Sequence, residues 1–342
     1  MSRTVVAATL RSGLAAAALA LVVARATAGC SSAVDCSLAG KCVNGACECQ
    51  DWAKGESCGE LNLQPVGSAS QIAPLVQPEG KATRWGGSVV LGDDGKYHMF
   101  SAEMANDCSL GVWGYLSTVI HSVSTSPLGP FTRLGLAVGA EAHNPVISRT
   151  ADRSLWLLWT CGCPRSHPPT GCTKEALTCP GGDSAAWTTT VYSSPTLDGP
   201  WTPHVNLLGN ITQGRLGSQN VSPLMRKDGS VALMFKGPDN NTEASIAVAP
   251  HWSGPYTLVA VNIFAKYFAE NITNEDCWWW QAGDESYHAL CHRMEPTNRE
   301  SFSSGGHAFG TSLTDWGYAI APAYNRTVFV EGNSTPFPLS RR

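Results

Sequence analysis

The sequence predicts an all-β fold, a five-bladed β-propeller that follows a small cysteine-rich module at the N-terminus. A unit of two apolar strands joined by a polar turn, followed by a strand rich in Ser, Thr, Ala and Val, recurs four times. Helix signals are absent from these repeats, and in the first three copies a Gly-Pro-aromatic corner follows the third strand. Repeated antiparallel sheets of this size are typical of propellers, which gather their chemistry in the funnel around the central axis.

Each copy supplies three strands in a fixed order. Period-2 alternation within short runs, bounded by Gly, Asp and Pro, is the pattern that predicts strands and turns. The expected strands are Ser88–Leu91, Tyr97–Phe100 and Val119–Val123 in the first copy, Asn144–Ile147, Leu155–Trp159 and Thr189–Tyr192 in the second, Ser222–Met225, Val231–Phe235 and Ile246–Ala249 in the third, and Glu275–Trp280, Tyr287–Cys291 and His307–Phe309 in the fourth. The corners are Gly129-Pro130-Phe131, Gly199-Pro200-Trp201 and Gly254-Pro255-Tyr256.

The chain that follows the fourth copy is short for a closing blade, which needs about four strands. We expect strands over Arg326–Val330 and Phe337–Leu339, with a further strand donated by Leu61–Val66. Even then the blade lacks a strand or so, and its unpaired edge is an aggregation liability. We therefore expect the chain to be truncated at Arg342 relative to a complete propeller.

Residues 1–28 have the pattern of a secretory signal peptide. Arg3 and Arg11 come first, and the apolar stretch from Leu14 to Val23 is about half the roughly 20 residues needed to span a bilayer. Ala26-Thr27-Ala28 then fits the small-x-small rule for signal peptidase, so we expect cleavage directly after it. The mature chain is expected to be secreted and extracellular, with no membrane span.

Composition narrows the classes of partner. A formal net charge of −4, with only 15% charged residues, supplies no basic stripe for nucleic acid. A hydrophobic content of 43%, with 12 Trp, is sufficient for one large β domain over residues 61–342 and an accessory module.

Six of the 13 cysteines lie close together near the N-terminus, with spacings of x5, x5, x4, x1 and x8. They are Cys30, Cys36, Cys42, Cys47, Cys49 and Cys58. So short a segment cannot bury a core and must be stapled by disulfides. A zinc site is disfavoured because the spacing lacks a C-x-x-C pair and the expected compartment is oxidising.

The spacing of these cysteines resembles an EGF-like domain of the compact tenascin type, over residues 30–60. That resemblance implies the pairs Cys30–Cys42, Cys36–Cys47 and Cys49–Cys58, and the absence of an acidic signature before Cys30 disfavours a calcium-binding variant. The module is interpreted as a spacer or cap, with a protein partner bound through it as the alternative.

Seven further cysteines fall in the propeller, so at least one is unpaired or intermolecular. Cys277 and Cys291 flank the fourth hairpin symmetrically and are expected to pair across it. The pairing of the other five stays open: Cys108, Cys161, Cys163, Cys172 and Cys179.

Asn-x-Ser/Thr sequons agree with export. Six are present, and Pro223 after the sequon at Asn220 disfavours glycan transfer there. The expected glycosylation sites are Asn210, Asn240, Asn271, Asn325 and Asn333.

The blades, the Asp-Gly hairpins, the Gly-Pro-aromatic corners and the Glu275-Asp276 opening of the fourth copy together resemble the five-bladed propeller glycosidases, glycoside hydrolase family 43 and its relatives. The resemblance covers about residues 61–342. It implies an Asp base on blade one, an orienting Asp on blade three and a Glu general acid on blade four. Glu275 fits the acid. Blade one has Arg84–Ser88 and blade three has Gln219–Ser222 at these places, and neither supplies a carboxylate.

Candidate ligand-binding residues stand at or near strand starts that face the funnel. A mixture of aromatic and hydrogen-bonding side chains suits sugars. The substrate-binding candidates are Trp85, Asn144, Asn220 and His307. Each has a structural alternative, because Trp85 can be core, Asn144 before Pro145 can cap a turn, and a lone His is commonly a satisfied structural group.

Two functions follow. The first is a secreted glycoside hydrolase that acts on a polysaccharide, with Glu275 as acid and a base supplied by Asp276, Glu103 or Asp107. The second is a non-catalytic carbohydrate-binding or adhesion protein with a degenerate hydrolase site. Neither reading calls for a cofactor or a metal. A second carboxyl group within about 10 Å of Glu275 inside the funnel would favour the enzyme.

Overall fold

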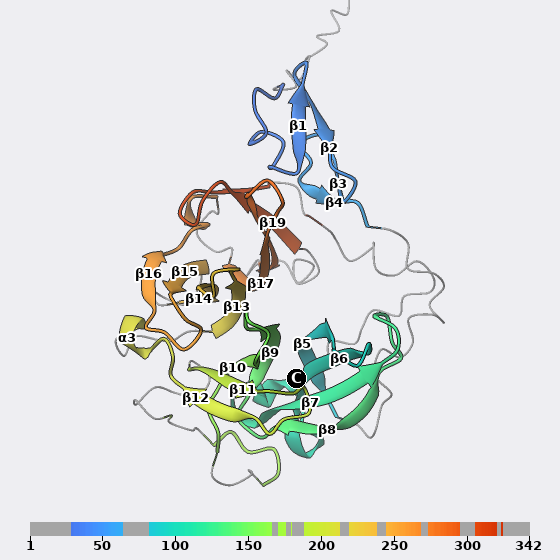
Figure 1. The fold of residues 1–342 in the computed structure, drawn as a ribbon, viewed down its shortest axis with the longest axis vertical. Coiled ribbons are helices and arrows are strands. Elements are labelled where there is room, and N and C mark those ends of the chain that lie inside the picture. The colour runs from blue at the N-terminus through green and yellow to red at the C-terminus, as the bar shows by residue number, and fades with distance from the viewer. Residues whose placement is uncertain are drawn as a thin grey trace, which may run out of the picture.

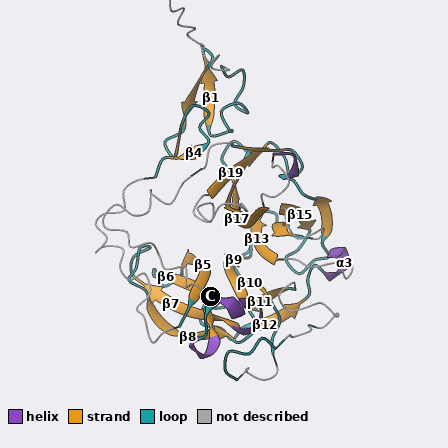
Figure 2. Ribbon diagram, turned by 180° about the vertical axis from the view of Figure 1, so that it is seen from behind, coloured by secondary structure: helices purple, strands orange, loops and turns teal. Residues whose placement is uncertain are grey.

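The structure is a computed structural model, and it describes residues 29–63, 82–165, 170–175, 179, 188–212, 219–237, 244–267, 273–294, 305–319 and 323. The described chain forms four blades that follow one another around an axis, with the N-terminal module beyond the fourth blade (Figure 1). Strands make up nearly all of the regular structure, as Figure 2 shows. The all-β propeller predicted from the repeats is therefore confirmed.

Each blade is a four-stranded antiparallel meander in chain order. Blade 1 contains β5 (Arg84–Leu91), β6 (Tyr97–Met104), β7 (Ser117–Ser124) and β8 (Thr132–Val138). Blade 2 contains β9 (His143–Arg149), β10 (Trp156–Cys161), β11 (Thr189–Ser194) and β12 (Thr202–Val205). Blade 3 contains β13 (Gln219–Met225), β14 (Val231–Lys236), β15 (Ala244–Ala249) and β16 (Thr257–Ala260). Blade 4 contains β17 (Thr273–Gln281), β18 (Tyr287–Met294), β19 (Gly305–Gly310) and β20 (Trp316–Tyr318).

Helical segments among the described residues are short. They are the 3-10 turns η1 (Ala105–Asp107), η2 (Leu110–Val112) and η4 (Ala265–Tyr267) and the single α turns α2 (Trp113–Leu116) and α3 (Gly209–Thr212). No helix in the described part of the chain is long and apolar enough to cross a bilayer.

The recurring corner joins the third strand of a blade to the fourth. Gly129, Gly199 and Gly254 have φ values of 80°, 85° and 91°, a left-handed conformation that glycine adopts without steric cost. The aromatic residue that follows turns inward, and Tyr256 is almost fully buried while its hydroxyl donates to the Trp252 carbonyl at 2.6 Å. The corner motif therefore contributes an aromatic side chain to the packing where the third strand of the blade turns into the fourth.

The hydrophobic core lies between successive blades rather than within one. Each of three clusters combines the inner strands of one blade with the face of the next. At the junction of blades 3 and 4, Trp279 is buried and its indole Nε1 donates to the Ser222 carbonyl at 2.8 Å. A blade is thus stabilised chiefly by its neighbour.

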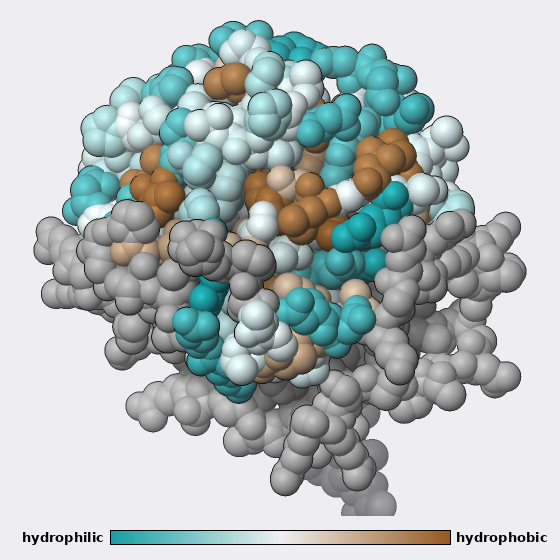
Figure 3. All heavy atoms as spheres, turned by 90° about the horizontal axis from the view of Figure 1, so that it is seen from below, coloured by the Kyte–Doolittle hydropathy of each residue, from teal (hydrophilic) through white to brown (hydrophobic). Residues whose placement is uncertain are grey.

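The outer surface is mostly hydrophilic on the face seen from below, with hydrophobic residues in separate groups (Figure 3). The exposed apolar side chains of the described residues include Val34, Leu136 and Val261. Scattered exposed apolar residues are ordinary on a folded chain.

The N-terminal module consists of two small hairpins. Its strands are β1 (Gly40–Val43), β2 (Ala46–Cys49), β3 (Ala53–Lys54) and β4 (Glu60–Leu61). The disulfides are Cys30–Cys42, Cys36–Cys47 and Cys49–Cys58, so the pairing that the resemblance implied is confirmed.

Three more disulfides lie in the propeller: Cys108–Cys172, Cys163–Cys179 and the predicted Cys277–Cys291. Cys161 is left as a buried free thiol, which accounts for the odd count. Six disulfides indicate an oxidising compartment.

Two expectations about the chain ends have different outcomes. Leu61 was expected to open a strand donated to the closing blade, but it pairs with Ala53 inside the module. Its amide donates to the Ala323 carbonyl at 2.9 Å, just beyond blade 4. The other expected closing strands, Arg326–Val330 and Phe337–Leu339, and the signal peptide lie outside the described residues.

Replacing Trp279 by Phe is expected to lower the free energy of unfolding by about 2–4 kcal/mol. The change leaves the buried Ser222 carbonyl without its donor and opens a cavity between blades 3 and 4. Trp278→Phe is the matched control, because Trp278 is the adjacent residue and is 48% exposed, so its loss should stay within about 0.5 kcal/mol. Urea unfolding of both variants measures the difference. Equal losses would show that the inter-blade hydrogen bond contributes nothing.

Candidate glycan-binding site

The innermost strand of each described blade has, near its start, a residue in the left-handed conformation. Gly86, Asn144, Asn220 and Asp276 have φ values of 60°, 46°, 53° and 53°. At each of these places the register between the first and second strands shifts, as in a β-bulge. Gly, Asn and Asp are the residue types that adopt this conformation most readily. The same local irregularity therefore reorients one residue in each described blade, and in blades 2 to 4 that residue has a side chain.

The re-aimed side chains of blades 2, 3 and 4 meet. The Asn144 amide Nδ2 donates to Asn220 Oδ1 at 2.9 Å and to Asp276 Oδ1 at 2.7 Å. Blade 1 contributes only backbone here, because a Cβ on Gly86 would lie 2.8 Å from Asn144 Oδ1. Blades 2, 3 and 4 are thus joined near the axis by a small polar cluster, and the backbone of blade 1 lies close to it.

This cluster forms one wall of a cavity of about 340 Å³, which we call the axial pocket. Its lining residues come from the innermost strands of all four described blades: Trp85, Gly86, Gly87, Ser88, Asn144, Pro145, Val146, Asn220, Val221, Asp276, Cys277 and Trp278. Three of the sequence-predicted residues, Trp85, Asn144 and Asn220, therefore line one pocket. Trp278 was not predicted, although it lies two residues beyond Asp276 on the same strand.

Glu275 was predicted to share this funnel surface, but its neighbour Asp276 lines the axial pocket instead. Glu275 lines a smaller neighbouring cavity, together with Asn220, Lys236 and Asp276. Glu275 lies 3.3 Å from Lys236 Nζ and 3.5 Å from His292 Nδ1. Burial acts to raise the pKa of Glu275, but His292 and Lys236 outweigh burial and hold that pKa below its usual value. Glu275 is therefore an ionised, paired carboxylate.

Asp276 has the opposite electrostatic environment. Burial, and then the negative charge of Glu275, raise the pKa of Asp276 to about 7. An oxygen of each carboxylate lies within 4.8 Å of the other. Two adjacent carboxyl groups thus differ in protonation near neutral pH, because one has cationic partners and the other does not.

The same place has donor atoms that could hold a cation. Oxygens of Glu275 and Asp276 and a nitrogen of His292 lie within 4.8 Å of one another. The Lys236 ammonium already neutralises Glu275, so a cation would have to compete with it. The only other such cluster among the described residues consists of Cys30, Cys36 and Cys47, whose sulfurs are consumed by disulfides.

His307 was predicted to bind substrate, and the structure places it elsewhere. It lies on the third strand of blade 4, fully buried, with its Nε2 3.0 Å from His288 Nδ1. Burial, and then His288, lower the pKa of His307 to about 4. It is a structural group, as the alternative interpretation held.

Neither of the other carboxylates considered as a base lies in the axial pocket. Glu103 is paired with Arg84 at 2.8 Å and with Arg133 at 3.2 Å. Asp107 is exposed in the turn η1.

Sequence reasoning missed two buried groups close to the starts of the innermost strands. Glu141 is buried beside Arg165 at 3.5 Å, and burial raises the pKa of Glu141 to about 7. The Cys161 sulfur accepts a hydrogen bond from the backbone N–H of Asn220 at 3.1 Å, and burial raises the pKa of the Cys161 thiol to about 12. Neither residue stands in a repeated motif that could have marked it.

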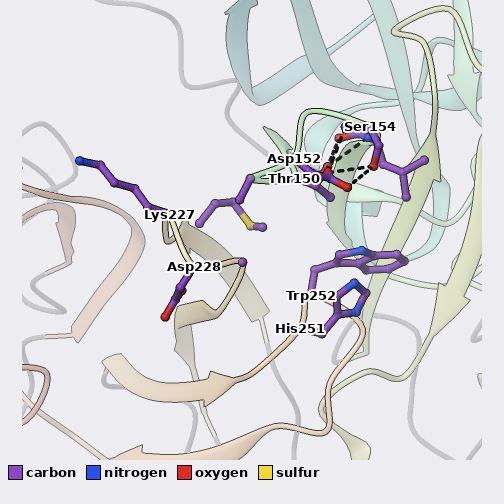
Figure 4. Close-up of a pocket in the computed structure, with 11 residues that line it drawn as sticks. Thr150, Asp152, Ser154, Lys227, Asp228, His251 and Trp252 are labelled. Atoms are coloured by element: carbon purple, nitrogen blue, oxygen red, sulfur yellow. Dashed lines mark hydrogen bonds between the residues drawn. The ribbon is translucent and has the colours of Figure 1, made fainter.

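A second cavity, of about 420 Å³, lies between the hairpin turns of blades 2 and 3 (Figure 4). Asp152 is occupied within its own turn, where it accepts hydrogen bonds from Thr150 and Ser154. Figure 4 shows Lys227 extending away from Trp252, on the opposite wall. The polar groups of this cavity do not converge as those of the axial pocket do, so we take the axial pocket as the candidate site.

Of the predicted glycosylation sites, only Asn210 is among the described residues. It is exposed in α3, and its amide donates to the Tyr256 carbonyl at 2.9 Å. Asn240, Asn271, Asn325 and Asn333 lie outside the described residues.

No protein-family model and no curated protein matches this sequence. Solved structures do match the fold. A family 117 glycoside hydrolase from the marine bacterium Zobellia galactanivorans is 14% identical, with a TM-score of 0.50, over 70% of each chain. An endo-arabinase from Bacteroides thetaiotaomicron is 13% identical, with a TM-score of 0.49, over 72% of this chain and 83% of that one. A GH43 protein from Bacillus licheniformis is 13% identical, with a TM-score of 0.47, over 69% of this chain and 43% of that one.

At these identities the likeness shows the fold alone. The chain has the β-propeller fold of a family 117 glycoside hydrolase, and it spans less than half the length of the GH43 protein. The class of protein that fold and site define is a glycosidase-like propeller with a polar axial pocket.

Replacing Asp276 by Asn is expected to flatten the dependence of stability on pH. The pKa of Asp276 is raised from 3.8 to about 7 by folding, so its contribution to stability is complete below pH 3.8 and is lost as pH rises toward 7. Each pKa unit corresponds to roughly 1.4 kcal/mol. Asn keeps the oxygen that accepts from Asn144 and does not titrate. The measurement is the difference in unfolding free energy between wild type and D276N from pH 4 to 8. A constant difference would contradict the raised pKa.

Proposed function

We propose that this protein binds a glycan in the axial pocket. The observation that carries the proposal is the convergence, from the innermost strands of four blades, of indole rings and hydrogen-bonding side chains on one cavity. Trp85 and Trp278 offer apolar ring surface, and Asn144, Asn220 and Asp276 offer amide and carboxyl groups. Sugars present both apolar C–H faces and hydroxyl groups, so a pocket with both kinds of wall suits them.

The fold supports this choice of ligand. The Zobellia galactanivorans protein is a glycoside hydrolase, and its propeller matches this chain. The six disulfides of the described chain support secretion. We propose that residues 1–28 are the signal peptide and that Asn210, an exposed residue in a sequon, is glycosylated. We also propose that residues 30–60 form an EGF-like domain, on the strength of their three disulfide pairs.

A second candidate function is hydrolysis of the bound glycan, and one observation favours it. Glu275 and Asp276 have pKa values pushed in opposite directions, which is how a protein assigns the roles of base and acid to two carboxyl groups. Asp276 near its pKa of about 7 would donate a proton to the leaving oxygen. Glu275, kept ionised by Lys236 and His292, would be the carboxylate partner.

Binding without hydrolysis is nevertheless the function that the geometry supports better. Inverting hydrolysis needs two carboxyl groups about 6.5–9.5 Å apart, flanking the scissile bond. The oxygens of Glu275 and Asp276 are within 4.8 Å and come from adjacent residues of one strand. Blade 1 has Arg84–Ser88 and blade 3 has Gln219–Ser222 where the family resemblance implies carboxylates, and neither segment contains one.

Asn144→Ala and Trp278→Ala are each expected to weaken glycan binding by about tenfold or more, the loss that one hydrogen-bonding or stacking group causes. Asn144 donates to both of its neighbours in the polar cluster, and Trp278 is an exposed wall of the axial pocket. Leu136→Ala is the control, because Leu136 is similarly exposed but lies on β8, outside the pocket. A glycan array identifies the ligand, and calorimetry on that ligand compares the variants. Wild-type affinity for the glycan in all three variants would show that the axial pocket is not the binding site.

Glu275→Gln is expected to abolish any hydrolysis of a bound glycan, because the Gln side chain carries no charge and does not exchange a proton. The fold should stay intact, because Gln has nearly the same shape as Glu. The measurement is release of reducing sugar from array-positive glycans by wild type, E275Q and D276N. Loss in both variants with binding retained supports the acid–base pair. Undiminished release in both would assign the chemistry to other groups, and no release by wild type leaves binding as the function.

A further inference from the structure

Blades 1 and 2 meet at an aromatic layer that contains a histidine pair of blade 1. His98 Nδ1 and His121 Nε2 lie 2.8 Å apart, and the two rings stack. His121 also stacks on Phe100, and Trp201, from the corner of blade 2, meets Phe100 edge-on with centroids 5.6 Å apart. This aromatic layer is how the next blade of the ring packs onto blade 1.

Blade 4 repeats this layer in the same register. His288 Nδ1 and His307 Nε2 lie 3.0 Å apart, and their rings stack. In blade 1, His98 is two residues before the partner of His121; in blade 4, His288 is two residues before the partner of His307. The other ring nitrogen of each second-strand histidine bonds into its hairpin turn, to Asp94 in blade 1 and to Ser286 in blade 4.

Among the described residues, the N-terminal module covers the blade-4 layer. Trp52 meets His288 edge-on with centroids 5.2 Å apart and His307 edge-on with centroids 5.7 Å apart. It also meets Trp280 of β17 edge-on at 6.0 Å. Both histidines are fully buried. Trp52 thus packs directly on the histidine pair of blade 4, whereas Trp201 packs on Phe100, which stacks on His121 of blade 1.

The rest of this contact is close and directional. A Cβ on Gly59 would lie 2.7 Å from the Ala319 Cβ, so the module backbone lies directly against the chain that follows β20. The Leu61 amide donates to the Ala323 carbonyl at 2.9 Å. Trp52 is itself held by its indole, which donates to Gln50 Oε1 at 2.7 Å. In Figure 1 the module lies next to blade 4, beyond β19.

We propose that the cysteine module is an intramolecular cap of blade 4, which docks through Trp52 onto the His288–His307 layer, as blade 2 packs onto the aromatic layer of blade 1. The interaction surface of the module is therefore directed at its own chain. A blade buries its apolar face only against a neighbour, as in other repeat architectures whose terminal units need capping. The disulfides make the cap rigid where its own core is small.

The cap also bears on the strand that carries the candidate site. Trp280 belongs to β17, four residues beyond Asp276, and Trp52 packs on it directly. Loss of the cap is therefore expected to loosen β17 as well as β18 and β19. This consequence is independent of whether the axial pocket binds a glycan.

The test is Trp52→Ala in the full chain, with Val34→Ala as the control, because Val34 is an exposed apolar residue of the same module. W52A should lower the melting temperature of the propeller by about 3 °C or more. It should also speed amide hydrogen exchange in β17, β18 and β19 by at least about tenfold. V34A should leave both unchanged, and disulfide mapping shows whether the module of each variant has folded. Unchanged exchange in blade 4 of W52A would overturn the proposal.

A second pair of variants tests docking without touching the aromatic ring. Gly59→Ala places a methyl group against Ala319, so it should reproduce the melting-temperature loss and faster exchange of W52A. Ala319→Gly removes the opposing methyl group. The loss of melting temperature caused by G59A should therefore be much smaller in the A319G background, measured as G59A/A319G against A319G, than in the wild type. Additive losses in the double variant would show that the two surfaces do not meet, and would overturn the proposal as well.

Discussion

Every blade of this propeller depends on the unit that covers its face. A four-stranded meander has too little interior to bury its own apolar residues, and the three large clusters of buried side chains all lie between successive blades. Trp279 illustrates the constraint, since its indole is buried against blade 3 and bonded to a carbonyl there. Both the order of the chain around the axis and the place of the cysteine module follow from this need for a neighbour.

The axial pocket arises from the same ring geometry. Because every described innermost strand has a bulge near its start, at an equivalent place, one residue from each blade is turned toward its counterparts in the others. In blades 2 to 4 the result is a polar cluster in which a single amide group, that of Asn144, bonds to two other blades. The bulge thus contributes to packing at the centre of the ring and lines that centre with hydrogen-bonding groups.

Much of the fold could be predicted from the sequence, because its signals are local. Alternation predicts the strands, Gly-Pro-aromatic triplets predict the corners, and the spacing of six cysteines resembles a known disulfide framework. Details of the site depend on longer-range geometry. The residue that lines the axial pocket, Asp276 rather than Glu275, is left-handed and stands at a register shift, which no alternation pattern reveals. His307 looked like a funnel residue because it lies near the start of a strand, but that strand is the third of blade 4, and its side chain is buried in contact with Trp52 of the distant module.

Gly86 limits how this scaffold could acquire a different chemistry. Its left-handed backbone, with φ of 60°, disfavours any residue with a Cβ, and the space a Cβ would need is occupied by the Asn144 side chain. A carboxylate installed there by a single substitution would collide with the amide that joins blades 2, 3 and 4. An evolutionary or engineered path toward a blade-one base must therefore change two blades at once, and the intermediate step loses the central hydrogen bonds. Gly86 therefore makes a carboxylate at this position of blade 1 unfavourable unless the Asn144 side chain also changes.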